Sequence, residues 1–431
     1  MKQYFTEVVG YDAIKEELYR ILDVMRNPER YRELGVKLSR GLILSGEPGV
    51  GKTLLCNCFI KASGWNSFIL RKNKSDGEFI KYVNNVFEKA KNKTPSIVFL
   101  DDLDKFSSGD DSYGEPEEYA IIQSNIDDCK ESEVFVLATA NNTRSIPHSL
   151  LREGRFDRHI KIEPPTVNDA ELIAKYYLQK KKISSDLDYR EIAKLLNGRS
   201  CAALETVINE AGIYAGMSKK KCIEREDIIK AFLRDVYGVS ESIGITKPEY
   251  IKAVSVHEAG HIVISEVLEP ESVNIATINL NSRDMNGQVS YEATEDEYFS
   301  LRHYENKILR HLGGKAATEV VFGKVDLGSI SDVQEAVKLI GRIADDFTAY
   351  GFGAWMTGLG PENVESKMVL DKKALTIQSE LERYYHMTKR LLTENREFLE
   401  SIAAGLAKKG TLAYQEIQQI KSGCTIIPFC Y

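Results

Sequence analysis

The sequence predicts a multidomain chain in which an α/β module with a small helical lid precedes a mainly α-helical domain. A length of 431 residues exceeds what one hydrophobic core usually serves, so two or three domains are expected. Apolar runs typical of buried parallel strands end in polar residues in the first part of the chain, whereas helical periodicity dominates later. Glycines, serines and a proline at 238–249 are typical of a linker between the two parts.

Composition narrows the class of protein. A hydrophobic content of 43% and a charged content of 28% are ordinary for a soluble globular chain. The net charge of −7 argues against nucleic-acid binding, because no basic excess is present to neutralise phosphates. The seven cysteines are scattered and form no C-x-x-C pair, which favours a reducing compartment. With no leader pattern and no apolar run of about 18 residues, we expect a cytoplasmic chain without a membrane span.

A glycine-rich loop follows the first predicted strand, at residues 41–45, and an apolar helical pattern follows the loop. Strand, G-x-x-x-x-G-K-T loop and helix are the context that a phosphate-binding loop requires. Backbone N–H groups surround the phosphates, the lysine reaches the β and γ oxygens, and the threonine holds magnesium. The expected nucleotide-binding residues are Gly46, Glu47, Pro48, Gly49, Val50, Gly51, Lys52 and Thr53.

Two further buried strands, at 96–100 and 134–139, lead into polar side chains. Asp101 and Asp102 come directly after the first, where a carboxylate at the carboxyl end of a parallel strand can face magnesium. Asn141 follows the second, in a place suited to orienting water near the γ-phosphate. These residues extend the predicted nucleotide site.

Clustered arginines follow the strand at 134–139, within the α/β part that is expected to span residues 1–163. Arg152 and Arg155 are three residues apart, and such arginines either lie on a solvated face or act on the phosphate of a neighbouring molecule. Residues 164–237 show only helical patterns and are predicted to form the small lid.

Residues 250–431 are predicted to form the second large domain, mainly helical with one β-hairpin. Strands at 273–278 and 288–291 flank the dipeptide Asn286-Gly287, a strong turn signal. The apolar C-terminal residues 425–431 are predicted to form a strand packed on their own domain, with a docking tail as the alternative.

This second domain opens with H-E-x-x-H, in which His257 and His261 lie four apart on one helix face and can bind one zinc ion. Glu258 is then the catalytic residue, placed to take a proton from zinc-bound water. A catalytic zinc needs a third protein ligand, and the sequence leaves four acids open: Glu319, Asp326, Asp332 and Glu335. The remaining histidines have no partner at ligand spacing and are interpreted as surface or packing residues: 148, 159, 303, 311 and 386.

Taken in order, these motifs resemble the FtsH-type ATP-dependent zinc metalloproteases. G-E-P-G-V-G-K-T, I-V-F-L-D-D-L-D, L-L-R-E-G-R-F-D-R and H-E-A-G-H occur in the family's order, and the likeness extends over nearly the full chain. The resemblance implies an α/β P-loop AAA+ module with a small helical lid, followed by a mainly α-helical zinc metallopeptidase domain. It also implies a ring, typically a homohexamer, with protein or peptide substrates and Zn²⁺, ATP and Mg²⁺ as cofactors.

The resemblance also carries individual roles onto matching positions. Asp101 matches the magnesium acid and Asn141 the sensor, while Arg152 and Arg155 match the arginine fingers that reach a neighbouring subunit's nucleotide. In the family the third zinc ligand is an aspartate in a stretch similar to residues 328–332, which selects Asp332.

Three departures from the family's pattern bear on function. Family members usually carry transmembrane segments ahead of the ATPase, and none is predicted here. The second acid of the motif at 101–102 is Asp102 rather than glutamate, and a carboxylate about 1 Å too far back can cost about 100-fold in hydrolysis. The tripeptide that matches the substrate-gripping pore loop is Ser75-Asp76-Gly77, without an aromatic residue; Phe79 and Trp65 are the nearby aromatic alternatives.

These observations favour an ATP-dependent zinc endopeptidase that degrades unfolded or misfolded proteins. Two alternatives stay open. One is a zinc peptidase whose ATPase is weak or serves only assembly, because of Asp102 and the altered pore loop. The other is a non-proteolytic AAA+ remodelling or regulatory ring subunit, which predicts that no zinc is bound.

Overall fold

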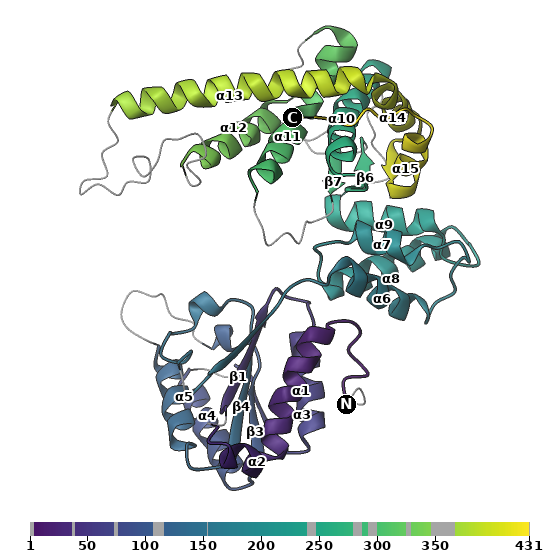
Figure 1. Cartoon of the computed structure of the whole chain (residues 1–431). Coiled ribbons are helices and arrows are strands. Elements are labelled where there is room, and N and C mark those ends of the chain that lie inside the picture. Colours follow the sequence, from purple (N-terminus) through teal and green to yellow (C-terminus); the bar gives the residue numbers. More distant parts are fainter. Residues whose placement is uncertain are drawn as a thin grey trace. The chain divides into compact units, whose positions relative to one another are not determined.

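The computed structural model describes residues 4–36, 39–72, 76–106, 116–152, 154–238, 247–278, 287–291, 300–324, 329–345 and 367–430. Contacts divide the chain into two compact units, Met1–Glu224 and Arg225–Tyr431 (Figure 1). Most of the predicted linker lies outside the described residues. The domain limits at 163, 237 and 249 stay predictions.

The first unit contains a five-stranded parallel sheet with the strand order β2-β3-β4-β1-β5. Its strands are β1 (Gly41–Gly46), β2 (Asn66–Leu70), β3 (Ser96–Leu100), β4 (Val134–Ala140) and β5 (Arg158–Ile162). β3 and β4 are buried along their whole length, as expected of parallel strands covered on both faces. β4 pairs with both β1 and β3, so the loops after these three strands leave from the same edge of the sheet.

Helices cover both faces of this sheet, with α1 and α3 on one side and α4 and α5 on the other (Figure 1). The helices of this part are α1 (Asp12–Arg26), α2 (Pro28–Glu33), α3 (Lys52–Ser63), α4 (Asp76–Lys91) and α5 (Glu117–Asp128), with short 3₁₀ turns at Leu103–Lys105 and Thr143–Ser145. Aromatic side chains such as Phe87 and Tyr119 fill the space between α4, α5 and the sheet. This core holds the carboxyl ends of the strands in place.

Helices follow β5, as the sequence predicts for the lid. They are α6 (Val167–Leu178), α7 (Tyr189–Leu195), α8 (Cys201–Met217) and α9 (Arg225–Tyr237). The hydroxyl of Thr166 accepts a hydrogen bond from the Asp169 N–H at the start of α6, and Ser200 caps α8 in the same way, which is the usual role of these residues at a helix N-terminus. The division of the chain falls between α8 and α9, and Arg225 at the start of α9 forms an ion pair with Glu416 (2.8 Å) in the second unit.

The second unit is mainly helical, as predicted. Its further helices are α10 (Pro248–Leu268), α11 (Leu301–Phe322), α12 (Ile330–Asp345), α13 (Lys367–Glu394), α14 (Arg396–Lys409) and α15 (Tyr414–Ser422). They surround one core to which α10, α11, α13 and α14 contribute buried leucine, isoleucine and alanine side chains. The two histidines of the H-E-x-x-H motif lie in the middle of α10, so the core of this unit fixes their position.

A small antiparallel sheet completes the second unit, with the strand order β7-β6-β8. The predicted hairpin is confirmed as β6 (Val273–Thr277) paired with β7 (Gln288–Tyr291), although Asn286 of its turn lies outside the described residues. The third strand, β8 (Thr411–Ala413), was not predicted because three residues carry no alternation.

The C-terminal segment packs on its own domain, as expected, but the prediction of a strand is wrong for its described residues. Asn395 replaces strand pairing by bonding both backbone groups of Ile427: its amide nitrogen donates to the carbonyl (3.1 Å), and its oxygen accepts from the N–H (2.8 Å). Phe429 lies under the Arg390 guanidinium at 4.9 Å. Among the described helices, none is both long and apolar enough to cross a membrane.

Candidate functional site

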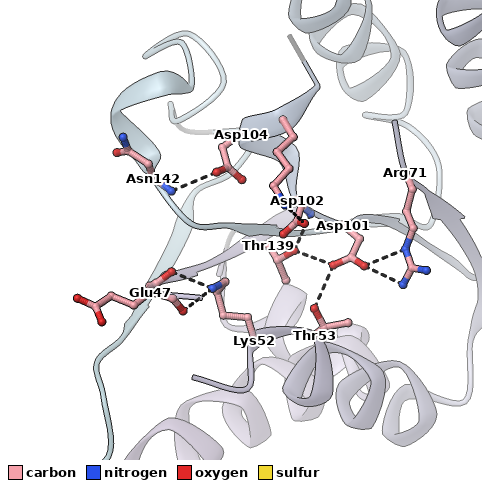
Figure 2. A network of polar contacts seen from close by, with 11 residues as sticks. Glu47, Lys52, Thr53, Arg71, Asp101, Asp102, Asp104, Thr139 and Asn142 are labelled. Carbon is pink, nitrogen blue, oxygen red and sulfur yellow. Dashed lines mark hydrogen bonds and ion pairs between the residues drawn. The ribbon is translucent and has the colours of Figure 1, made fainter. Parts of the chain in front are cut away.

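The glycine-rich loop connects β1 to α3 and places Lys52 at the first turn of that helix (Figure 2). The Lys52 ammonium donates to the carbonyl oxygens of Gly46 and Glu47, each at 2.8 Å. Burial lowers the pKa of Lys52, and Asp102 acts in the opposite direction. A buried ammonium whose protein partners are neutral carbonyls is suited to exchanging them for phosphate oxygens, so the loop fits a nucleoside triphosphate.

Asp101 lies at the carboxyl end of β3 and receives the Thr53 hydroxyl on Oδ1 at 3.2 Å. Thr139, near the end of β4, donates to the same oxygen at 2.9 Å. Arg71, which follows β2, contacts Oδ2 (Figure 2). A threonine hydroxyl and a carboxylate side by side are oxygen ligands suited to magnesium. The sequence did not indicate Thr139 or Arg71, because neither belongs to a local motif.

Asp102 differs from Asp101 in its surroundings. Its backbone is in the left-handed region (φ 59°), its N–H donates to Thr139 Oγ1 (2.8 Å), and its carboxylate pairs with Lys105 at 2.7 Å. Asn141 follows β4 at the same sheet edge and is half-buried. Both residues therefore lie beside the loop, and their roles toward a nucleotide remain proposals.

The two arginines predicted as fingers have different environments. Arg155 is held inside its own unit, because Asp127 at the end of α5 binds its guanidinium at 2.8 Å and the Ser149 carbonyl accepts from it at 2.6 Å. This contact with Arg155 lowers the pKa of Asp127 to about 2. Arg152 is exposed and forms no ion pair with any residue that the structure describes.

The start of α8 also reaches the glycine-rich loop, which the sequence did not reveal. The Ala202 N–H donates to the Gly49 carbonyl at 3.1 Å, and the Cys201 thiol lies 3.8 Å from the Val50 carbonyl. Tyr11 joins the same region through its hydroxyl, which contacts Cys201 Sγ at 3.5 Å. Ser200 indicates in the sequence that a helix starts there, but it does not indicate that this helix contacts the glycine-rich loop.

The predicted pore-loop tripeptide is only partly described. Ser75 and the side chain of Asp76 lie outside the described residues, and Gly77 lies at the start of α4. Phe79 is fully buried and packs edge-on against Phe106, with ring centroids 5.1 Å apart. Its interpretation as a substitute pore aromatic is therefore wrong, because its ring belongs to the core. Trp65 is half-buried.

In the second unit, α10 and α12 bring His257, His261 and Asp332 together. His257 Nε2 lies 3.1 Å from His261 Nε2 and 3.2 Å from Asp332 Oδ2, and the third separation, from His261 Nε2 to Asp332 Oδ2, is 3.6 Å. Ligand bonds of about 2.1 Å at tetrahedral angles require donor atoms about 3.4 Å apart. The cluster therefore fits a zinc site with one position left for water.

Neighbouring groups favour the protonation states of His261 and Asp332 that can bind a metal ion. The Arg310 carbonyl accepts the Nδ1 proton of His261 at 2.7 Å, which leaves the Nε2 lone pair facing the cluster. Burial works against ionisation of Asp332, but contacts with His257 and His261 hold its pKa well below the usual range. Burial raises the pKa of Glu258, against the effect of the histidines. A raised pKa is the direction that favours proton acceptance by a carboxylate near neutral pH.

The other acids considered from the sequence have different partners. Glu319 pairs with Lys389 (2.6 Å) and accepts a hydrogen bond from Tyr385, and Glu335 pairs with Lys338 (2.5 Å). Asp326 lies outside the described residues. His311, interpreted from the sequence as a surface or packing residue, lines the same pocket as the cluster, with its Nδ1 3.9 Å from Asp332 Oδ1.

A pocket of about 930 Å³ opens at the cluster. Glu258 lines it opposite residues of β7, and Tyr291, Arg310 and Lys307 form part of its wall. Among the described residues β7 is an edge strand of its sheet, so the pocket with the metal-binding cluster lies beside a strand edge that no other described strand pairs with. This arrangement has room for an extended peptide.

The fold and the two sites define the class of protein. It combines a P-loop ATPase module and a zinc metallopeptidase region in a single chain. Two family models match, one described as "ATPase family associated with various cellular activities (AAA)" over residues 42–164 and one as "Peptidase family M41" over residues 244–420.

Curated relatives show the same combination. The ATP-dependent zinc metalloprotease FtsH 2 of Phytoplasma mali is 30% identical over 96% of this chain and 62% of its own length. FtsH of Bacillus subtilis is 30% identical over 96% of this chain and 69% of its own length. FtsH of Helicobacter pylori (strain J99) is 28% identical over 97% and 70%. The chain belongs to the FtsH-type ATP-dependent zinc metalloproteases, a family whose cofactors are Zn²⁺, ATP and Mg²⁺.

Proposed function

We propose that the chain is an ATP-dependent zinc endopeptidase that degrades unfolded or misfolded proteins. The observation that carries this proposal is the set of three donor-atom separations among His257, His261 and Asp332, close to those of a tetrahedral zinc, with Glu258 in the same pocket. These three residues are the proposed zinc ligands.

Glu258 is the proposed general base. When bound, zinc supplies an acidified water and polarises the peptide carbonyl. Glu258 takes the proton of that water and passes it to the leaving amine, a role that its burial-raised pKa supports. Asp332 stays ionised throughout, and His261 stays in the tautomer that Arg310 selects.

The roles at the nucleotide site are proposed from the positions of its residues around the glycine-rich loop and from the family's motifs. The loop from Gly46 to Thr53 cradles the phosphates, with Lys52 on the β and γ oxygens. Asp101 faces magnesium, Asp102 polarises the attacking water, and Asn141 orients it. Arg152 and Arg155 act on the nucleotide of a neighbouring subunit in a ring, which we propose to be a homohexamer. Use of ATP and the seven free cysteines favour the cytoplasm.

Cleavage of a fluorescently labelled unfolded casein by the purified chain with zinc and ATP tests the peptidase proposal. Glu258→Gln is expected to lower the cleavage rate by about 10²- to 10⁴-fold, because it removes the proton acceptor. Its zinc content should stay at one ion per chain, since the three ligands are unchanged. Equal cleavage by wild type and Glu258→Gln, or a wild type that binds no zinc, contradicts the proposal.

A second candidate is a zinc peptidase whose ATPase is weak or serves only assembly. The pairing of Asp102 with Lys105 favours it, because that carboxylate is both shorter than glutamate and already engaged. This candidate predicts equal cleavage rates with ATP and with a non-hydrolysable analogue, and no cleavage without nucleotide. A strict requirement for hydrolysis rules it out.

A further inference from the structure

The carboxylate of Asp101 is saturated by donors from its own chain. Oδ1 accepts from Thr53 Oγ1 (3.2 Å) and Thr139 Oγ1 (2.9 Å), and Oδ2 accepts from Arg71 Nε (2.9 Å) and Nη2 (2.8 Å). Figure 2 shows the three side chains converging on it. A carboxylate offers about four lone-pair positions. Among the described residues, these donors already take all four.

The donors on the two oxygens differ in how easily they can leave. Thr53 and Thr139 have short side chains that start on α3 and β4, and a hydroxyl can bind a cation through its oxygen while still donating its proton. Arg71 reaches Asp101 through a long side chain that is 61% exposed, whereas the Asp101 side chain is 11% exposed. A magnesium ion that binds Asp101 through its water ligands therefore has to reach Oδ2. At that oxygen its waters compete with the Arg71 guanidinium.

We propose that Arg71 is a positioning residue of the ATP site, a counter-ion from the same chain that holds Asp101 Oδ2 and gives it up when the magnesium nucleotide binds. The proposal rests on the proposed use of ATP. If it holds, the magnesium concentration that the site needs depends on Arg71 as well as on the glycine-rich loop and the acidic residues.

Two effects of opposite sign follow. Without a divalent cation, Arg71 neutralises Asp101 and so reduces its repulsion of the nucleotide phosphates. With magnesium present, the guanidinium competes for Oδ2 and raises the magnesium concentration that the site needs. A residue that only supports the end of β2 would not separate these effects, because its loss would weaken binding in both conditions.

Binding of N-methylanthraniloyl-ATP to the full chain, followed by fluorescence, measures both effects. In excess EDTA, Arg71→Gln is expected to bind the nucleotide about three- to tenfold more weakly than wild type. In a magnesium titration at fixed nucleotide, its half-saturating magnesium concentration is expected to fall by a similar factor. Arg71→Met, which keeps an unbranched apolar stem but removes the charged guanidinium, should behave in the same way.

Two variants serve as controls. Arg71→Lys keeps the charge and should restore much of the wild-type behaviour. Arg190→Gln removes one exposed positive charge on α7 of the same unit and should change neither quantity. If both charge-removing variants at residue 71 weaken binding in EDTA and in magnesium alike, or change neither, the proposal is overturned. A wild type that binds no nucleotide even in saturating magnesium overturns the proposed ATP use instead.

Discussion

At the residue scale, the acidic side chains around H-E-x-x-H differ in the partners that they find. Glu319 has a lysine and a tyrosine, and Glu335 has a lysine on its own helix. Asp332 is surrounded by histidine nitrogens, and its Oδ2 lies within 3.6 Å of both motif histidines. A carboxylate that already pairs with a lysine gains less free energy from binding a metal ion than a carboxylate whose neighbours are themselves metal ligands.

Asp332→Asn is therefore expected to weaken zinc binding by more than the 10- to 100-fold that loss of an outer-shell partner costs, because it removes a ligand's charge. Competition with a chromogenic zinc chelator measures the affinity. Glu335→Gln is the matched control, one turn further along α12 and in the same pocket, and should bind zinc as wild type does. Zinc loss in Glu335→Gln with retention in Asp332→Asn would reverse the assignment.

At the element scale, the helices α10 and α11 approach closely through glycines. A Cβ on Gly260 would lie 2.3 Å from the Gly313 carbonyl oxygen and 2.6 Å from the Ala317 Cβ, and one on Gly313 would lie 2.9 Å from the Gly260 carbonyl oxygen. Backbone atoms cannot rotate away as a flexible side chain can. This contact brings the Arg310 carbonyl within reach of His261, so helix packing also sets the histidine tautomer.

Gly260→Ala is expected to destabilise the metal-free chain by about 1–3 kcal/mol or more, because the added methyl group overpacks two fixed helices. Gly341→Ala on α12 is the matched control, since nothing lies within 4 Å of its Cβ position and alanine is favoured over glycine in a helix by up to about 1 kcal/mol. Thermal unfolding with EDTA should show a lower midpoint for the first variant and an unchanged or higher one for the second. Equal midpoints would argue against the close-packing account.

Elements whose signal is local could be predicted, and those defined by tertiary contact could not. The glycine-rich loop, the hairpin of β6 and β7 and the H-E-x-x-H helix each follow from neighbouring residues. Arg71 carries no pattern, because its position relative to Asp101 depends on the pairing of β2 with β3. Phe79 was misinterpreted for the same reason: an aromatic near the pore-loop position belongs to the core only once α4 is packed.

At the scale of the whole molecule, the proposed action on a neighbouring subunit depends on how Arg152 and Arg155 are held. Arg155 must leave Asp127 to reach a neighbour, and this would remove the guanidinium whose contact lowers the pKa of that carboxyl. Arg152 is exposed and has no such bond among the described residues. If a ring forms, Arg152 is the arginine that is free to act first, and Arg155 becomes available only with a change in its own unit.

A mixing experiment distinguishes action on a neighbouring subunit from action within one chain. Lys52→Ala should lose nucleotide binding but keep its arginines, whereas Arg152→Ala should keep its nucleotide site but lack the arginine that its neighbour needs. Each alone is expected to have little ATPase activity. In a 1:1 mixture, Arg152→Ala sites beside Lys52→Ala subunits regain an arginine, so the rate per chain should rise above both pure variants. A rate equal to their average would place Arg152 on its own chain's nucleotide, because exchange of subunits then repairs nothing.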